Sequence, residues 1–513
     1  MVVGVGIFLS RVVGLVRGLA FSAYFGAGAA SDAYTAAFKI PNALRNLLGE
    51  GTLSASFVPV YSRMLASADE KTSRTLANAV LGLLMMAVSI LTLAGIAAAP
   101  ALTRVLTTGF DPATQALTTR LMRIMFPMTA VMVLSGWCLG IQNSHRRFFW
   151  SYASAALWSI AQIVLLVAWG RQAATLEQLA VWLAWATLVG AALQVAAQLP
   201  EVLRLHGALR PSIRRDAEGV PAVMRNVLPV VFALGVTQIS SFIDLVIAAR
   251  LEPGTMTLVN NANLVALLPV ALFGISVAAA SLPDFARDTT GATLDALRDR
   301  LRGGWQRILF YIVPSAAAFI ALGDYIIGIL YRAGRFTAED QFVAHGILAG
   351  YAVGLVSFGS VKLMSSAYYA LQDYRTPLRA SVASVVVSGV AAAAIAFTFR
   401  ESRLAAAGIA LGAALGSYTN LVLLLRGLRA RLGPLYTPAM WAGTRRIVVA
   451  TAVAVVVGLL LRLLQDRAWP GAHPRVAGPP ILASFGVAYL LAAWAMGSAE
   501  AARWLRLRPR GRE

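Results

Sequence analysis

The sequence is 513 residues long, with 58% hydrophobic and only 13% charged residues. Soluble proteins carry about one-quarter charged residues, so this composition and the mean hydropathy of +0.70 indicate an integral membrane protein. The net charge of +21 comes mostly from short loops between apolar segments. That pattern is typical of membrane topology and argues against nucleic-acid binding.

Apolar stretches recur along the whole chain, each about as long as a helix that crosses a membrane. The first lacks the pattern of a cleaved signal peptide, so we expect it to be a retained span. We predict an all-α protein with about 14 transmembrane helices. They are placed near residues 2–26, 32–61, 75–106, 116–143, 150–169, 178–204, 222–250, 256–285, 305–331, 341–371, 377–398, 404–428, 444–464 and 479–503.

An even number of spans puts both termini on the same side of the membrane. The loops on that side hold about 26 Lys and Arg residues, and those on the other side about 11. Because cytoplasmic loops are enriched in these residues, we predict that both termini are cytoplasmic.

The chain contains a weak internal repeat. "SFVPVYSR" (56–63) resembles "ASLPDFAR" (280–287), which pairs Pro59 with Pro283. "GIQNSHRR" resembles "ALQDYRTP", which pairs Gln142 with Gln372. The two pairs are separated by nearly the same length of chain. Two matches at nearly the same offset predict two parallel six-helix repeats, a common plan for transporters.

The predicted domains follow from this repeat. They are an N-terminal six-helix lobe (1–215), a C-terminal six-helix lobe (216–435), and two additional transmembrane helices with a basic cytoplasmic tail (436–513).

The second span is unusually polar for a membrane helix. On a helical wheel its polar residues fall on one side, and apolar residues cover the other. Such a helix can face packed protein or lipid on one side and a polar cavity on the other. Pro41 is expected to bend it. The polar residues are Asp32, Lys39, Asn42, Arg45, Asn46 and Glu50.

The first span adds Arg11 and Arg17, so the two spans together carry more cations than carboxylates. One interpretation is internal salt bridging, with side chains near the ends reaching the interface. However, a structural network in a medium of low dielectric would tend towards neutrality. The surplus favours a site for a large anion, and diphosphate suits it because guanidinium groups bind phosphate oxygens bidentately.

Asp244 is an isolated carboxylate in the seventh span. It is either a cation or proton site or one member of a buried pair with an arginine from another helix. The sequence has no Walker A motif, no His/Cys cluster with metal spacing and no credible nucleophile–base pair. We therefore do not expect an enzyme or a bound cofactor.

Three segments carry a resemblance to a known family. "SRVVGLVRGLAFSAYFGAGAASDAYTAAFKIPNALRNLLGEGTLSASFVPVYSRML" (10–65) is similar to the N-terminal signature of the MurJ/MviN lipid II flippases. These belong to the multidrug/oligosaccharidyl-lipid/polysaccharide exporter superfamily. "YRAGRFTAED" (331–340) and "YALQDYRTPLRA" (369–380) resemble two further family segments.

The resemblance implies two six-helix lobes around a cationic cavity, with two C-terminal helices forming a groove for the lipid tail. It implies transport of undecaprenyl-diphosphate disaccharide-pentapeptide from the inner to the outer leaflet of the bacterial cytoplasmic membrane by alternating access. The family's essential arginines fall on Arg11, Arg17 and Arg45, and its acidic positions on Asp32 and Glu50. Membrane potential or a monovalent cation would drive the cycle. The implied partners are the lipid-linked glycan, membrane lipids and cell-wall synthesis proteins.

One segment departs from the family pattern. Helix 8 of the family usually carries an arginine and then an acidic residue before a proline, but "NNANLVALLP" (260–269) has Leu264 and Leu267 there. This departure keeps alternatives open: a flippase for another polyprenyl-diphosphate glycan, another exporter of the superfamily, or a non-transporting lipid-binding scaffold. A membrane glycosyltransferase is disfavoured because no catalytic loop is present.

Overall fold

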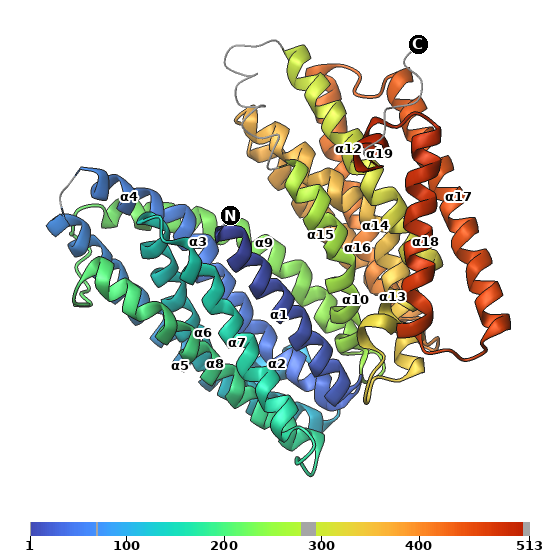
Figure 1. The fold of residues 1–513 in the computed structure, drawn as a ribbon. Helices are drawn as coiled ribbons and strands as arrows, with labels where there is room; N and C mark the ends of the chain where they lie inside the picture. Colours follow the sequence, from blue (N-terminus) through green and yellow to red (C-terminus); the bar gives the residue numbers. More distant parts are fainter. Residues whose placement is uncertain (1, 68–69, 279–293, 506–513) are drawn as a thin grey trace. The chain divides into compact units, whose positions relative to one another are not determined.

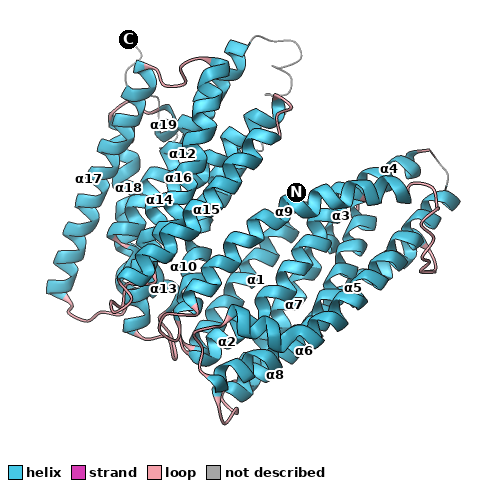
Figure 2. Cartoon of the chain, turned by 180° about the vertical axis from the view of Figure 1, so that it is seen from behind, coloured by secondary structure: helices cyan, strands magenta, loops and turns pink. Residues whose placement is uncertain are grey.

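The computed structural model describes residues 2–67, 70–278 and 294–505, with the side chains of residues 2–8, 50, 232–233, 236–237 and 275 left out. Over these residues the chain consists of helices and loops (Figure 2). Ten of the described helices are long and apolar enough to cross a membrane, or 11 if one bent pair counts as a single span. The all-α membrane fold predicted from the sequence is confirmed, and the predicted count of about 14 helices is compatible with it.

The helices pack into two units, Met1–Thr257 and Leu258–Glu513 (Figure 1). In the first, α1 packs on α7 and α6 packs on α2, α5 and α8, around buried clusters of aliphatic and aromatic side chains. Its helices are α1 (Val2–Phe25), α2 (Ala29–Leu48), α3 (Glu50–Ser56), α4 (Val58–Ala66), α5 (Glu70–Leu106), α6 (Pro112–Ser144), α7 (Phe148–Trp169), α8 (Leu176–His206) and α9 (Val220–Ala248).

In the second unit α14 packs against α12 and α16, and α15 packs along α16. The two additional C-terminal helices are α17 and α18, which pack on each other. The chain from the unit boundary onward forms α10 (Thr255–Pro269), η1 (Val270–Ile275), α12 (Leu294–Ala321), α13 (Gly323–Tyr331), α14 (Ala338–Ala370), α15 (Arg375–Thr398), α16 (Ala407–Leu432), α17 (Pro438–Ala468), α18 (Pro474–Ala495) and α19 (Ala499–Leu505).

Helix boundaries repeat at a constant interval along the chain. α6 and α14 are both 33 residues long and begin after the N-caps Asp111 and Thr337. α8 and α16 end at glycines with positive φ, Gly207 and Gly433, which are separated by the same interval as the two N-caps. The first residues of α2 and α10 are separated by this interval too. The two halves of the chain therefore share one register.

This register corrects one of the two sequence matches. The turns after α6 and α14 each contain one non-glycine residue in the left-handed region, Arg146 (φ 59°) and Gln372 (φ 58°). Gln372 thus corresponds to Arg146, and its pairing with Gln142 was wrong by about one helical turn. The other match, of Pro59 with Pro283, lies outside the described residues.

The contact-defined boundary after Thr257 differs from the domain boundary predicted at 215/216. The difference arises because α9, although it begins the second repeat, packs on α2, α3 and α5 of the first. The division into two six-helix lobes stays a prediction.

Two predicted spans are interrupted helices. The span predicted over 32–61 is divided at Gly49 and Phe57, while α2 continues through Pro41. At Gly49 a Cβ atom would lie 2.5 Å from the Arg45 carbonyl oxygen, so this break requires glycine. The span predicted over 305–331 consists of α12 and α13, which meet at an angle of 80°.

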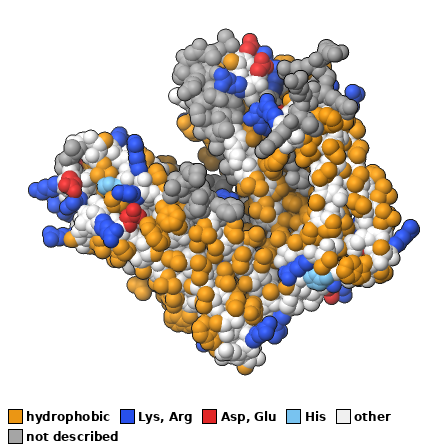
Figure 3. All heavy atoms as spheres, in the orientation of Figure 1, with side chains coloured by type: hydrophobic (Ala, Val, Ile, Leu, Met, Phe, Trp, Pro, Cys, Tyr) orange, Lys and Arg blue, Asp and Glu red, His pale blue; other side chains and the backbone are white. Residues whose placement is uncertain are grey.

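Hydrophobic side chains cover the middle of each unit on the face seen in Figure 3, and the Lys and Arg side chains gather mostly towards the ends of the units. This distribution is typical of helices that cross a bilayer, where charges concentrate outside the hydrocarbon core.

Candidate substrate-binding site

Two of the predicted cations, Arg17 and Arg45, meet at one aromatic side chain in the first unit. The guanidinium carbon of Arg17 on α1 lies 4.5 Å from the ring centroid of Trp158 on α7. The guanidinium carbon of Arg45 on α2 lies 5.8 Å from the same centroid. Three helices therefore bring two positive charges onto a single aromatic platform.

Contacts with neighbouring residues hold the Trp158 ring in place. Trp158 is buried, and its Nε1–H donates a hydrogen bond to the Thr187 carbonyl oxygen at 3.1 Å. Its ring stacks on Phe38 at a centroid distance of 5.9 Å. Nearby, the hydroxyls of Tyr34 and Thr187 are 2.7 Å apart. These contacts fix the ring plane, so the two arginines share a preformed surface.

The two arginines have different described partners. Both arginine side chains are half-buried. Arg17 has no carboxylate within ion-pair distance in the part of the chain that the structure describes, and an Arg45 Nη2–H donates to Asn46 Oδ1 at 3.3 Å. A cation over an aromatic ring gains roughly 0.5–2 kcal/mol, but two cations so close still repel. The arrangement is suited to an anion that bridges them.

Asp32, one of the two acidic positions implied by the family resemblance, has its described partners away from these arginines. Its side chain is 1% exposed. Oδ2 accepts hydrogen bonds from the backbone N–H groups of Gly254 and Met256, and Oδ1 accepts from the backbone N–H and hydroxyl of Thr257. Asp32 thus caps the N-terminus of α10, where a carboxylate is favoured by the helix dipole. Binding of substrate by Asp32 stays a prediction.

Lys39 and Asp244 interact across the contact between α2 and α9. The ammonium group of Lys39 and the carboxylate of Asp244 interact electrostatically with each other. Oδ1 of Asp244 is buried and has no hydrogen-bond partner among the described residues. Of the two interpretations left open for Asp244, pairing with a cation from another helix is nearer to the structure, but the cation is a lysine on α2.

The polar side chains of α2 therefore point towards two different parts of the first unit. Asp32 and Lys39 point towards α9 and the loop after it, while Arg45 points towards α7. The apolar side packs inside the unit, where Ala33 and Ala37 are fully buried.

The remaining residues predicted for the site have fewer described contacts. Arg11 is exposed on α1, and Asn42 is half-buried on α2. The side chain of Glu50 lies outside the described residues. On α10, Leu264 and Leu267 are 47% and 45% exposed. No group of three or more His, Cys, Asp or Glu side chains that could hold a metal ion occurs among the residues that were described.

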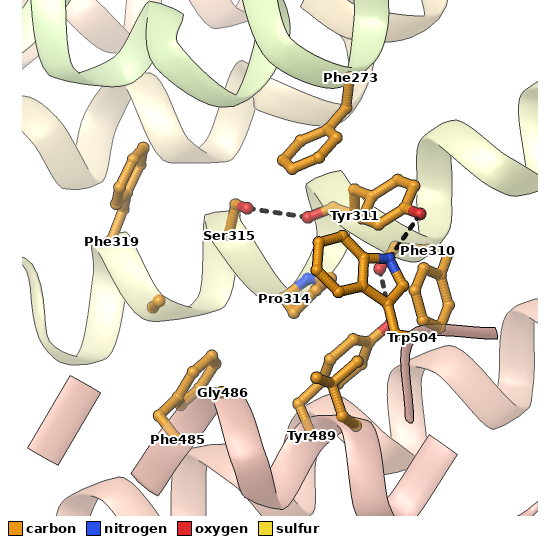
Figure 4. Close-up of a pocket in the computed structure, with 12 residues that line it drawn as sticks. Phe273, Phe310, Tyr311, Pro314, Ser315, Phe319, Phe485, Gly486, Tyr489 and Trp504 are labelled. Atoms are coloured by element: carbon orange, nitrogen blue, oxygen red, sulfur yellow. Dashed lines mark hydrogen bonds between the residues drawn. The ribbon is translucent and has the colours of Figure 1, made fainter. Parts of the chain in front are cut away.

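The second unit contains an aromatic pocket of about 310 Å³ between α12, η1, α18 and α19 (Figure 4). The rings of Phe273 and Tyr311 stack at 4.3 Å. Trp504 Nε1–H donates to the Tyr311 hydroxyl at 2.9 Å, and the Tyr489 hydroxyl donates to the Phe310 carbonyl oxygen at 2.5 Å. The polar atoms of these rings are thus partnered, which leaves an apolar lining.

The fold and the cationic platform define a multi-pass helical membrane protein of the transporter class. Residues 21–473 match the family model "Lipid II flippase MurJ". Because this match covers most of the chain, the protein belongs to the MurJ family.

Curated relatives agree over nearly the full length. The chain is 29% identical over 501 residues to "Lipid II flippase MurJ" of Burkholderia cenocepacia, covering 95% of each chain. It is 29% identical over 470 residues to "Probable lipid II flippase MurJ" of Vibrio cholerae, covering 90% of this chain and 87% of that one.

Solved structures show the same fold. "Lipid II flippase MurJ, inward closed conformation" superposes with a TM-score of 0.80 at 20% identity, covering 98% of this chain and 99% of that one. An inward-facing multidrug resistance MATE transporter of the MOP superfamily superposes with a TM-score of 0.66 at 18% identity, covering 83% and 95%. At these identities the likeness concerns the fold alone.

Proposed function

We propose that this protein is a lipid II flippase, which moves undecaprenyl-diphosphate disaccharide-pentapeptide from the inner to the outer leaflet of the bacterial cytoplasmic membrane by alternating access. The observation that carries the proposal is the convergence of Arg17 and Arg45 on Trp158 in a member of the MurJ family. Both termini are cytoplasmic in this proposal, as the distribution of loop charge favours.

The diphosphate is the part of the substrate that this site would hold. Each guanidinium presents paired N–H donors that match two phosphate oxygens, which a lysine ammonium does not. A diphosphate between Arg17 and Arg45 would accept hydrogen bonds from both guanidinium groups. Arg11, Asn42, Asn46 and Glu50 are proposed to complete the polar surroundings. The diphosphate would therefore be bound by both guanidinium groups.

The aromatic pocket of the second unit supports the lipid part of the proposal. Its lining is apolar, and α18 is one of the two helices expected to form a groove for the lipid tail. Burial of each methylene there would contribute about 0.8 kcal/mol. We propose that a segment of the polyprenyl chain occupies it.

No cofactor is required by this proposal. The driving force is the membrane potential or a monovalent cation, with Asp244 as the candidate coupling residue. One elementary charge moved through 100 mV is worth about 2.3 kcal/mol. Cell-wall synthesis proteins are proposed partners because the transported glycan is their substrate.

A second candidate function rests on α10. Because Leu264 and Leu267 are exposed and uncharged, the second half offers the diphosphate no cation at the positions where the family usually has charge. This favours a flippase for another polyprenyl-diphosphate glycan, or a lipid-binding scaffold of the same fold that does not transport.

Complementation of a bacterium depleted of its own lipid II flippase tests the proposal. Wild-type protein is expected to restore growth and the accessibility of lipid II at the outer leaflet, and Arg17→Ala is expected to abolish both. Arg104→Ala is the matched control, because Arg104 is an exposed arginine of the same unit that donates to the Pro100 carbonyl oxygen. Stable insertion without rescue would replace the first proposal by the second.

A further inference from the structure

The exposed surface of the first unit carries a second basic site, away from Trp158. Arg120 and Arg123 on α6 and Trp185 on α8 line a pocket of about 560 Å³ together with Ala116, Thr119 and Ile124. Arg120 and Arg123 are three residues apart on a helix, so their side chains leave the same face. The small side chains of Ala116 and Thr119 open the space beside them.

Both arginines lack counter-charges from the protein. They are exposed, and within the part of the chain that the structure describes neither forms an ion pair. Trp185 is 52% exposed beside them. An arginine on the outside of a membrane helix is costly unless it reaches the interface or meets an anion. The site therefore presents two guanidinium groups on the exposed surface without a described counter-charge.

The depth of the site fits the boundary between hydrocarbon and headgroups. α6 has 33 residues and is about 50 Å long, whereas the hydrocarbon core is about 30 Å thick. Arg120 lies eight residues after Pro112, about 12 Å from the start of the helix. A tryptophan at this level is typical of the membrane interface.

The second repeat shows that the fold does not need these charges. In the shared register, the positions of Arg120, Arg123 and Trp185 are occupied by Gly346, Ala349 and Leu411. α14 and α16 pack together there as α6 and α8 do in the first repeat. A site that is present in only one of two equivalent helix pairs points to binding and not to helix packing.

We propose that Arg120, Arg123 and Trp185 form a binding site for the phosphate of an anionic phospholipid, such as phosphatidylglycerol. The two guanidinium groups bind the phosphate oxygens, and the acyl chains lie along Ile124 and the ring of Trp185. This site is separate from the one proposed for the transported lipid, and it does not depend on what that lipid is.

Lipid binding to the purified full-length protein tests this proposal. Bound lipids are counted by native mass spectrometry during titration with dioleoyl phosphatidylglycerol or dioleoyl phosphatidylcholine. Wild-type protein is expected to bind the anionic lipid about tenfold more tightly, because each arginine near the headgroups contributes to binding. The double variant Arg120→Ala/Arg123→Ala is expected to lose this preference.

Arg171→Ala is the matched control, because Arg171 is an exposed arginine in the loop after α7, outside the pocket. It should keep the preference for phosphatidylglycerol. Arg120→Lys/Arg123→Lys should keep part of it, since the charge remains but the bidentate geometry is lost. Alanine is compatible with the fold, because the second repeat has Gly346 and Ala349 at these positions, and size-exclusion profiles check this.

Equal binding of the two lipids by wild-type protein would overturn the proposal, as would an unchanged preference in the double alanine variant. Inorganic phosphate at the same concentration is added in a third titration. Displacement of the lipid by phosphate alone would show that the site recognises a free anion, which would also overturn the assignment to a phospholipid.

Discussion

Asp32 Oδ2 accepts a hydrogen bond of 2.7 Å from the backbone N–H of Gly254, a residue 222 positions later in the chain. Further hydrogen bonds from Met256 and Thr257 reach the same buried carboxylate. One side chain on α2 thereby fixes the start of α10. This long-range cap makes Asp32 a stability determinant as well as a candidate site residue.

We predict that Asp32→Ala destabilises the protein by at least about 1–3 kcal/mol, because buried backbone donors lose their acceptor. Thermal unfolding in detergent, followed by size-exclusion fluorescence, measures the effect. Asp111→Ala is the comparison, since Asp111 caps the exposed start of α6 and its loss should cost about 1 kcal/mol. Equal shifts for the two variants would contradict the role of burial.

Trp158 is predicted to matter for binding of the diphosphate although it carries no charge. Trp158→Leu keeps an apolar side chain but removes the platform for Arg17 and Arg45. Affinity for a polyprenyl diphosphate should fall about fivefold to thirtyfold, which corresponds to roughly 1–2 kcal/mol for two cation–π contacts. Trp158→Phe should retain part of the affinity, and titration calorimetry distinguishes the two. Wild-type affinity in Trp158→Leu would rule out the platform.

Lys39 and Asp244 should show coupled effects. Lys39→Met leaves the buried Asp244 without the cation that acts on it and is expected to lower stability. Asp244→Asn alone leaves Lys39 without the carboxylate that interacts with it, and is likewise expected to lower stability. The double variant Lys39→Met/Asp244→Asn should be more stable than the sum of the single effects predicts. A double-mutant cycle on melting temperatures measures the coupling, and additive effects would show that the two side chains act independently.

The turn after α14 predicts a pH dependence. Hydrogen bonds from the backbone N–H and hydroxyl of Thr376, aided by Arg431, lower the pKa of Asp373 to about 2. An unfolded aspartate titrates near about 3.9, so the stabilisation is complete above that pH and is lost as the pH falls towards about 2. Between those pH values, a plot of melting temperature against pH should be steeper for wild-type protein than for Asp373→Asn. Parallel curves would contradict this.

The sequence predicted those features that depend on composition and local pattern. The hydrophobic spans identified an integral membrane protein. The helical wheel of residues 32–51 identified the side of α2 on which Ala33 and Ala37 are buried. The 10–65 segment carried the family resemblance, which the family match over residues 21–473 confirmed. These properties are encoded within a few turns of helix.

The rest depends on segments that are distant in sequence. Nothing near Trp158 marks it as the partner of two arginines that lie on α1 and α2, far earlier in the chain. Likewise, Asp32 and Lys39 carry no local sign of their partners on α9 and the loop after it. Pro41 was expected to bend the second span, and α2 continues through it. The helix is interrupted at Gly49, where the backbone excludes a side chain, and the sequence pattern did not indicate this position.

The constant interval between the two repeats has one more consequence. In that register the polar residues Lys39, Asn42, Arg45 and Asn46 of α2 have the counterparts Val265, Leu268, Ala271 and Leu272. The two halves therefore differ at these positions: the first has polar and cationic side chains, and the second has aliphatic side chains. In the proposed transport cycle, only the first half offers the diphosphate cations at these positions.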